Sequence, residues 1–172
     1  MHQSVMKFIA DVKPDVTGLR VLEVGSCNVN GSVRPLFDGA GLYFGIDIQG
    51  GPGVDLVIPV EGMTLRDDMY FEYFDVVVSC EMLEHAEHWS TAFHAMADLL
   101  KPGGTLLLTA RGPGFPRHNP PDHWRFTLAM VNDACRVCGL FVESLMQDPQ
   151  VPGVFLRAQK RRMPDALPAP RG

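Results

Sequence analysis

The residues best suited to chemistry begin in a short stretch near the N-terminus, VLEVGSCNVNG, residues 21–31. An apolar run containing Glu23 stops at Gly25, polar residues follow, and Gly31 precedes an apolar helical pattern. This order predicts a strand, a tight turn and a helix start, in which glycines without a Cβ atom bring backbone N–H groups close to a ligand. The Glu23 carboxylate, late in the strand, can face the same crevice. The alternative is an ordinary strand–helix turn that binds nothing.

The spacing of the glycines limits the kind of ligand. Dinucleotide-binding turns carry the pattern G-x-G-x-x-G, and Cys27 occupies the position of its second glycine here. A pyrophosphate needs the close backbone approach that this glycine allows. The turn therefore disfavours NAD and leaves room for a ligand without a pyrophosphate.

Strands and helices alternate along the chain and must position this turn. The alternation predicts an α/β fold, a doubly wound, Rossmann-like and mostly parallel sheet with helices on both faces. Apolar runs predict strands at residues 20–25, 42–48, 54–60, 73–79 and 105–110. Helical patterns lie at residues 4–12, 32–37, 90–100 and 127–138, and residues 61–71 suit a helix or a loop.

The last two predicted strands, residues 140–146 and 154–159, are joined by a Pro/Gly turn, so we expect an antiparallel pair at a sheet edge. Residues 101–104, Lys-Pro-Gly-Gly, predict a turn into the fifth strand. Ligands of such sheets bind beyond the carboxyl ends of the strands. The residues that should surround this crevice are Gly25, Asp47, Cys80 and Arg111.

Length and composition are those of a small globular protein. The 172 residues predict one domain over residues 1–159, followed by a Pro-rich, basic tail at residues 160–172 that we expect to be disordered. The net charge of −5 makes a nucleic acid an unlikely main partner. No apolar stretch is long enough to cross a membrane, and residues 1–10 lack the apolar core of a signal peptide. Four cysteines without a disulfide framework favour a cytoplasmic protein.

Metal and hydrolase chemistry are less favoured. No G-x-S-x-G motif is present, which disfavours a serine hydrolase. Potential metal ligands come in pairs rather than in complete sets, so we expect no metal site. These pairs are Cys135 with Cys138, Glu84-His85 with His88, and His118 with His123.

Four stretches, in this order, carry a resemblance to a known family. They are VLEVG at residues 21–25, GID at 45–47, FDVVVSCEMLEH at 74–85 and LLKPGGTLLLT at 99–109. Together they resemble the class I S-adenosylmethionine-dependent methyltransferases, in particular the broad group that acts on small molecules and carbohydrates. The resemblance covers residue 20 to about residue 143. It implies S-adenosyl-L-methionine as cofactor and a seven-stranded sheet whose last strand is antiparallel.

The resemblance also implies roles for particular residues. It places the methionine part of the cofactor over Glu23 and Gly25, the ribose hydroxyls on Asp47 and the adenine beside Ile48. No acid for the adenine is evident after the third strand, because Asp55 lies inside that predicted strand. The expected cofactor-binding residues are Glu23, Gly25, Ser26, Cys27, Asn30, Asp47, Ile48, Cys80 and Glu81.

Methyl transfer from a sulfonium is an in-line displacement on an activated donor. The protein must align the acceptor, exclude water and remove a proton from a hydroxyl or amine. His85 either acts on that proton or only caps its loop by bonding a backbone carbonyl. The candidate catalytic residues are His85, His118, Asp122 and His123.

The polar loop at residues 118–125 has two interpretations. It forms the wall of the acceptor site, or it is a structural loop in which Arg125 pairs with Asp122 and Trp124 packs inward. Trp89 and Trp124 suit contact with a sulfonium or a sugar, and ordinary packing equally.

The predicted function is methyl transfer to an oxygen or nitrogen of a small molecule or glycan, in a monomeric or homodimeric enzyme. A nucleic-acid or protein methyltransferase is the first alternative. The acidic charge disfavours it, as does Cys-Glu-Met-Leu at residues 80–83 in place of an Asn/Asp-Pro-Pro-Tyr motif. The second alternative is a cofactor-binding protein without catalysis, suggested by the loss of glycines from the turn at residues 25–31.

Overall fold

One sheet organises the chain in a computed structural model, which describes residues 2–65, 70–117 and 121–162. In this part of the chain seven strands are ordered β3-β2-β1-β4-β5-β7-β6. The strands are β1 (Arg20–Val24), β2 (Leu42–Asp47), β3 (Leu56–Val57), β4 (Phe74–Cys80), β5 (Leu100–Arg111), β6 (Leu140–Gln147) and β7 (Gly153–Lys160). The predicted doubly wound α/β fold is confirmed.

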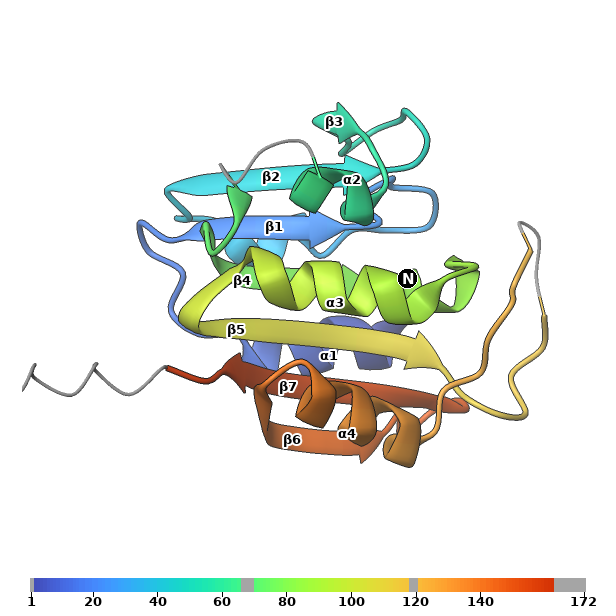
Figure 1. The fold of residues 1–172 in the computed structure, drawn as a ribbon. Helices are drawn as coiled ribbons and strands as arrows, with labels where there is room; N and C mark the ends of the chain where they lie inside the picture. The colour runs from blue at the N-terminus through green and yellow to red at the C-terminus, as the bar shows by residue number, and fades with distance from the viewer. Residues whose placement is uncertain (1, 66–69, 118–120, 163–172) are drawn as a thin grey trace, which may run out of the picture.

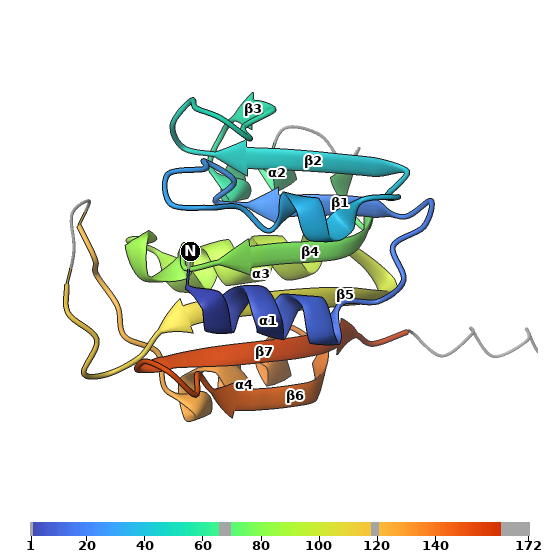
Figure 2. The same cartoon turned by 180° about the vertical axis from the view of Figure 1, so that it is seen from behind.

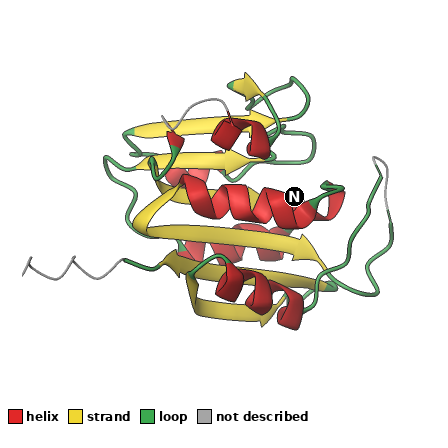
Figure 3. Ribbon diagram, viewed as in Figure 1, coloured by secondary structure: helices red, strands yellow, loops and turns green. Residues whose placement is uncertain are grey.

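Helices cover both faces of the sheet. Figures 1 and 2 show α2, α3 and α4 on one face and α1 on the other, and Figure 3 shows the same layers by element type. The helices are α1 (Gln3–Val12), α2 (Val60–Leu65), α3 (Trp89–Leu99) and α4 (Leu128–Val137), with 3-10 turns η1 (Arg34–Phe37) and η3 (Leu83–His85). None of the described helices has the length and apolar character needed to cross a membrane.

The strand order reverses next to β1, which pairs in parallel with both β2 and β4. Connections leave this point toward opposite halves of the sheet, so the carboxyl ends of β1, β2 and β4 border a crevice. At the other edge β7 is antiparallel to both β5 and β6. The predicted antiparallel edge pair is therefore confirmed.

The central strands are apolar because both of their faces are covered. In β1, Leu22 packs with the core on the side of α3, while Val21 belongs to the core on the side of α1. The neighbouring strand β4 divides in the same way between Val77 and Val76. This burial on both faces explains why the sequence shows unbroken apolar runs rather than alternation.

Two local predictions are wrong. The third strand contains only two residues, and Asp55 precedes it: its carboxylate accepts the Gly45 amide at 2.7 Å and pairs with Arg34, so it anchors a loop. The expected turn at residues 101–104 lies within β5, which starts at Leu100. There a register shift in the pairing with β4 accommodates the Pro-Gly-Gly sequence.

The chain beyond β7 is described only in part. Lys160, which we expected to begin the disordered tail, ends β7, and the Arg161 amide donates to the Gly139 carbonyl at 3.2 Å. Residues 163–172, the rest of the predicted tail, lie outside the described residues.

Gly45 of β2 provides a test of the close packing between this strand and the neighbouring loops. A Cβ atom there would overlap the Gly53 carbonyl oxygen and lie 2.7 Å from Ser26 Oγ. We expect Gly45→Ala to destabilise the fold by about 1–3 kcal/mol, with a fall in Tm of roughly 2–4 °C per kcal/mol. Gly50→Ala is the matched control, because its Cβ would meet only Val57 Cγ2, at 3.7 Å. Equal melting temperatures for the two variants would contradict this account.

Candidate active site

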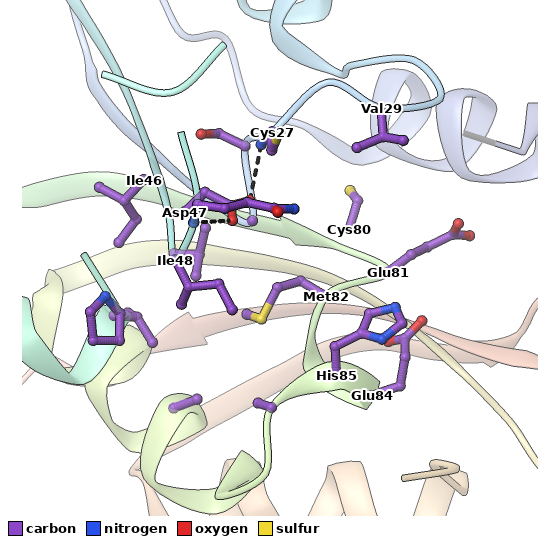
Figure 4. A pocket seen from close by; sticks show the side chains of 18 of the residues that line it. Cys27, Val29, Ile46, Asp47, Ile48, Cys80, Glu81, Met82, Glu84 and His85 are labelled. Atoms are coloured by element: carbon purple, nitrogen blue, oxygen red, sulfur yellow. Dashed lines mark hydrogen bonds between the residues drawn. The ribbon is translucent and has the colours of Figure 1, made fainter. Parts of the chain in front are cut away.

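A cleft of about 980 Å³ lies at the carboxyl ends of β1, β2 and β4. The turn after β1, the end of β2 and the loops after β4 and β5 line it, as Figure 4 shows in part. Every predicted site residue that the structure describes lines it: Glu23, Gly25, Ser26, Cys27, Asn30, Asp47, Ile48, Cys80, Glu81, His85, Asp122 and His123. His118 lies outside the described residues.

The turn after β1 uses its own backbone donors. The amides of residues 25 and 26 donate to Ile46 O at 2.9 and 3.0 Å, and the next two donate to Asp47 Oδ2 at 3.1 Å and Pro52 O at 2.8 Å. These amides are consequently not directed at a phosphate. This arrangement agrees with the missing glycine pattern and leaves ligand recognition largely to side chains.

A glycine is required at residue 25 for a reason that the sequence did not reveal. Its φ is +82°, and a Cβ atom there would lie 2.6 Å from Cβ and Cγ of Met82. The glycine makes room for Met82, which comes from the loop after β4 and itself lines the cleft. Gly25 also lines the cleft, and its contact with a ligand stays a prediction.

Asp47 joins the ends of two strands. Its Oδ2 accepts the Cys27 amide and its Oδ1 accepts the Gln49 amide, both at 3.1 Å (Figure 4). A carboxylate has about four acceptor positions, so both oxygens keep the capacity to accept hydroxyl donors. Apolar side chains flank it on the lining of the cleft, Ile48 at 77% exposure and Val29 at 71%.

Glu23 lies deeper and is nearly completely buried. The Tyr43 hydroxyl donates to its Oε2 at 2.7 Å. Burial raises the pKa of Glu23 to about 7, against the lowering effects of Tyr43 and Arg34. The carboxyl is thus balanced between its neutral and charged forms, and a cation beside it would favour the charged form.

A buried ion network holds the loop after β4. Glu81 has a left-handed backbone, with φ +55°, and its carboxylate pairs with the buried Arg111 at the end of β5. Arg111 also lies 3.8 Å from Asp148, which accepts a hydrogen bond from Ser4 of α1 at 3.0 Å. These contacts tie the loop to β5, to the β6–β7 turn and to α1.

The loop after β5 is held against the turn η3. His85 Nδ1 lies 3.2 Å from the Pro121 carbonyl oxygen, and the amides of His123 and Trp124 donate to Glu84 O at 2.8 and 3.2 Å. Arg125 binds both carboxylate oxygens of Asp122. The expected Arg125–Asp122 pair is therefore present, and Asp122 and His123 nevertheless line the cleft.

The two tryptophans pack away from the cleft. Their rings meet edge-on at 6.2 Å between centroids, and the Trp124 indole N–H donates to the Glu87 carbonyl at 3.1 Å. Neither is among the described residues that line the cleft. The two rings pack against each other, Trp124 remains 37% exposed, and contact of either ring with a ligand stays a prediction.

Comparison with known proteins identifies the family. A family model described as "Methyltransferase domain" matches residues 2–138. The chain belongs to the methyltransferase domain family. No curated protein matches the sequence.

Solved structures share the fold of this methyltransferase domain at low identity. A chain of the complex between the Haloferax volcanii Trm112 methyltransferase activator and a methyltransferase is 19% identical, with a TM-score of 0.69 over 94% of this chain and 91% of that chain. A second structure is Burkholderia thailandensis 1,6-didemethyltoxoflavin-N1-methyltransferase, bound to 1,6-didemethyltoxoflavin and S-adenosylhomocysteine. It is 15% identical, with a TM-score of 0.70 over 92% of this chain and 76% of that chain. An S-adenosylmethionine-dependent methyltransferase from Mesorhizobium loti is 16% identical, with a TM-score of 0.69 over 91% and 97%.

Sequence reasoning missed several residues of the methyltransferase cleft. Met82 and Glu84 lie within the motif at residues 74–85, but we considered Glu84 only as a partner of His85 for a metal. Glu61 comes from α2, a segment that the pattern left as helix or loop, and it also lines the cleft. Within the described residues no group of three or more His, Cys, Asp or Glu side chains is placed to hold a metal ion.

The raised pKa of Glu23 predicts a pH-dependent stability. The pKa of Glu23 in the folded protein, about 7, exceeds the ordinary value of 4.5. The contribution of this carboxyl to the free energy of unfolding is therefore complete below pH 4.5 and is lost as the pH rises through 7. Glu23→Gln lacks this loss. We expect the variant to gain up to about 3 kcal/mol relative to the unmodified protein between pH 5 and pH 8.

Urea denaturation at the two pH values measures this gain. Asp38→Asn is the matched control, because Asp38 is exposed and lies outside the cleft, and it should follow the unmodified protein. Parallel stability–pH curves for Glu23→Gln and the unmodified protein would contradict the assignment.

Proposed function

We propose that this protein transfers the methyl group of S-adenosylmethionine to an oxygen or nitrogen of a small molecule or carbohydrate. The observation that carries the proposal is the Asp47 carboxylate at the strand-order reversal, in a chain of the methyltransferase family. It faces the turn after β1 and has acceptor capacity on both oxygens. Such a carboxylate suits the two neighbouring hydroxyls of a ribose.

The cleft offers complementary surfaces for the rest of this cofactor. The exposed Ile48 side chain provides an apolar face for the adenine. Glu61 provides an acid for the adenine, which the sequence analysis did not find. Glu23 lies under the expected methionine end. An ammonium or sulfonium group near Glu23 would stabilise its charged form, so cofactor and carboxylate would stabilise each other.

Methyl transfer needs alignment and a proton acceptor rather than a nucleophilic residue. Alignment of the reacting groups alone can contribute about 7–11 kcal/mol. If His85 donates Nδ1–H to the Pro121 carbonyl, its other ring nitrogen, Nε2, can accept a hydrogen bond from the molecule that receives the methyl group. Asp122 is bound on both oxygens by Arg125, which suits it to hold the loop that carries His123 rather than to act as the base.

The charge of the cleft supports a small acceptor over a nucleic acid. Arg111 is the one described lining residue with a permanent positive charge, and it is already paired. A phosphate backbone would meet repulsion here. The Burkholderia neighbour of the same fold is named as a 1,6-didemethyltoxoflavin-N1-methyltransferase and has 1,6-didemethyltoxoflavin bound. The lining carboxylates are Glu23, Asp47, Glu61, Glu81, Glu84, Glu87 and Asp122.

Cofactor binding tests the proposal. We expect S-adenosylhomocysteine, but not NAD, to raise the melting temperature. At 100 times its Kd, the ligand should raise the free energy of unfolding by about 2.7 kcal/mol. Asp47→Ala removes the charge-assisted hydrogen bonds to the ribose, each contributing about 1.5–3 kcal/mol. In titration calorimetry its Kd should rise at least about tenfold.

Asp133→Ala is the control, because Asp133 is exposed on α4 and its ion-pair partner among the described residues is the nearby Arg136. It should bind as the unmodified protein does. Stabilisation by NAD alone, or unchanged affinity in Asp47→Ala, would overturn the proposed function.

A further inference from the structure

Glu84 is a buried acid that the fold satisfies only in part, through a hydrogen bond from its own backbone amide. It is 1% exposed, and among the described residues no hydrogen-bond partner reaches its Oε2. The residue nevertheless belongs to the lining of the cleft, and Figure 4 shows its side chain extending from the same turn as His85. A buried polar group without a partner is unfavourable, and in a native protein it calls for an explanation.

The nearby positive charges are already paired. Arg111 binds Glu81 and approaches Asp148, and Arg125 binds Asp122. Glu81 and Asp122 add negative potential at Glu84, and Arg111 only partly opposes it. The described surroundings therefore favour a positive group brought by a ligand.

The position of Glu84 is fixed by its backbone. Its carbonyl accepts the amides of His123 and Trp124, which hold the loop after β5. The same short segment contains Met82, which packs against Gly25 in the turn after β1. Glu84 thus lies between the region proposed for the cofactor and the loop proposed for the acceptor.

We propose that the acceptor is an amine that is cationic in water, and that Glu84 binds its N–H groups and accepts its proton. This inference rests on the proposed function. An ammonium supplies both a positive charge and the donor that Glu84 Oε2 lacks, whereas a neutral hydroxyl supplies only a donor. A phosphate or carboxylate acceptor would be repelled.

The chemical step is balanced without another reactant. The ammonium gives a proton to Glu84, leaving a neutral amine and a carboxylic acid. The amine lone pair forms a bond to the methyl carbon, the carbon–sulfur bond breaks, and its electron pair stays on sulfur, which becomes a neutral thioether. The positive charge passes to nitrogen, so the product is a methylated ammonium. Burial raises the pKa of Glu84 to about 7, which suits a proton acceptor that works near neutral pH.

The experiment uses the full chain, labelled S-adenosylmethionine and a panel of primary and secondary amines with their matched alcohols and carboxylates. We expect turnover of amines only. Glu84→Gln should lower that turnover at least about 100-fold while its Kd for S-adenosylhomocysteine stays within about twofold. The variant should not lower Tm, because the amide oxygen of glutamine can keep the hydrogen bond from the backbone and the buried charge is removed.

Glu143→Gln, outside the cleft, is the matched control and should retain turnover. Turnover of alcohols or carboxylates, no amine turnover, or full activity in Glu84→Gln would each overturn the inference while S-adenosylhomocysteine binding upholds the proposed function. Loss of turnover in EDTA that MgCl₂ restores only when Glu84 is present would show a metal ligand instead, and would also overturn it. Failure to bind S-adenosylhomocysteine would overturn the proposed function first.

Discussion

The hydrogen bond from the Cys27 amide to Asp47 is the contact on which the cleft depends. It joins the turn after β1 to the end of β2, which are neighbouring parallel strands with Val24 opposite Ile46. The close approach of the Gly53 carbonyl to Gly45 keeps the next loop against the same strand. Register, turn and loop together determine where the carboxylate points, so the geometry of the cleft follows from the pairing of β1 with β2.

Much of this arrangement could be predicted from the sequence. The central strands were recognisable because burial on both faces requires unbroken apolar runs, and strand ends placed Asp47 and Cys80 on one crevice. Contacts between distant segments were not recognisable. The need for glycine at residue 25 depends on Met82, and the position of Asp55 outside the strand depends on its bonds to Gly45 and Arg34.

Several of the carboxylates that line the cleft have a partner in the fold, and the buried Glu84 differs from them. Asp47 accepts backbone amides, Glu23 accepts the Tyr43 hydroxyl, and Glu81 pairs with Arg111. Glu84 has no such partner for its Oε2 within the described part of the chain. Sequence alone could not separate these carboxylates, because their roles depend on partners that lie far away along the chain.

A crystal structure of the protein with S-adenosylhomocysteine would test the central claim most directly. The account predicts both ribose hydroxyls within about 3 Å of the Asp47 carboxylate oxygens, with the bond from the Cys27 amide retained. A ribose bound elsewhere in the cleft, or an Asp47 side chain turned away from the ligand, would contradict it.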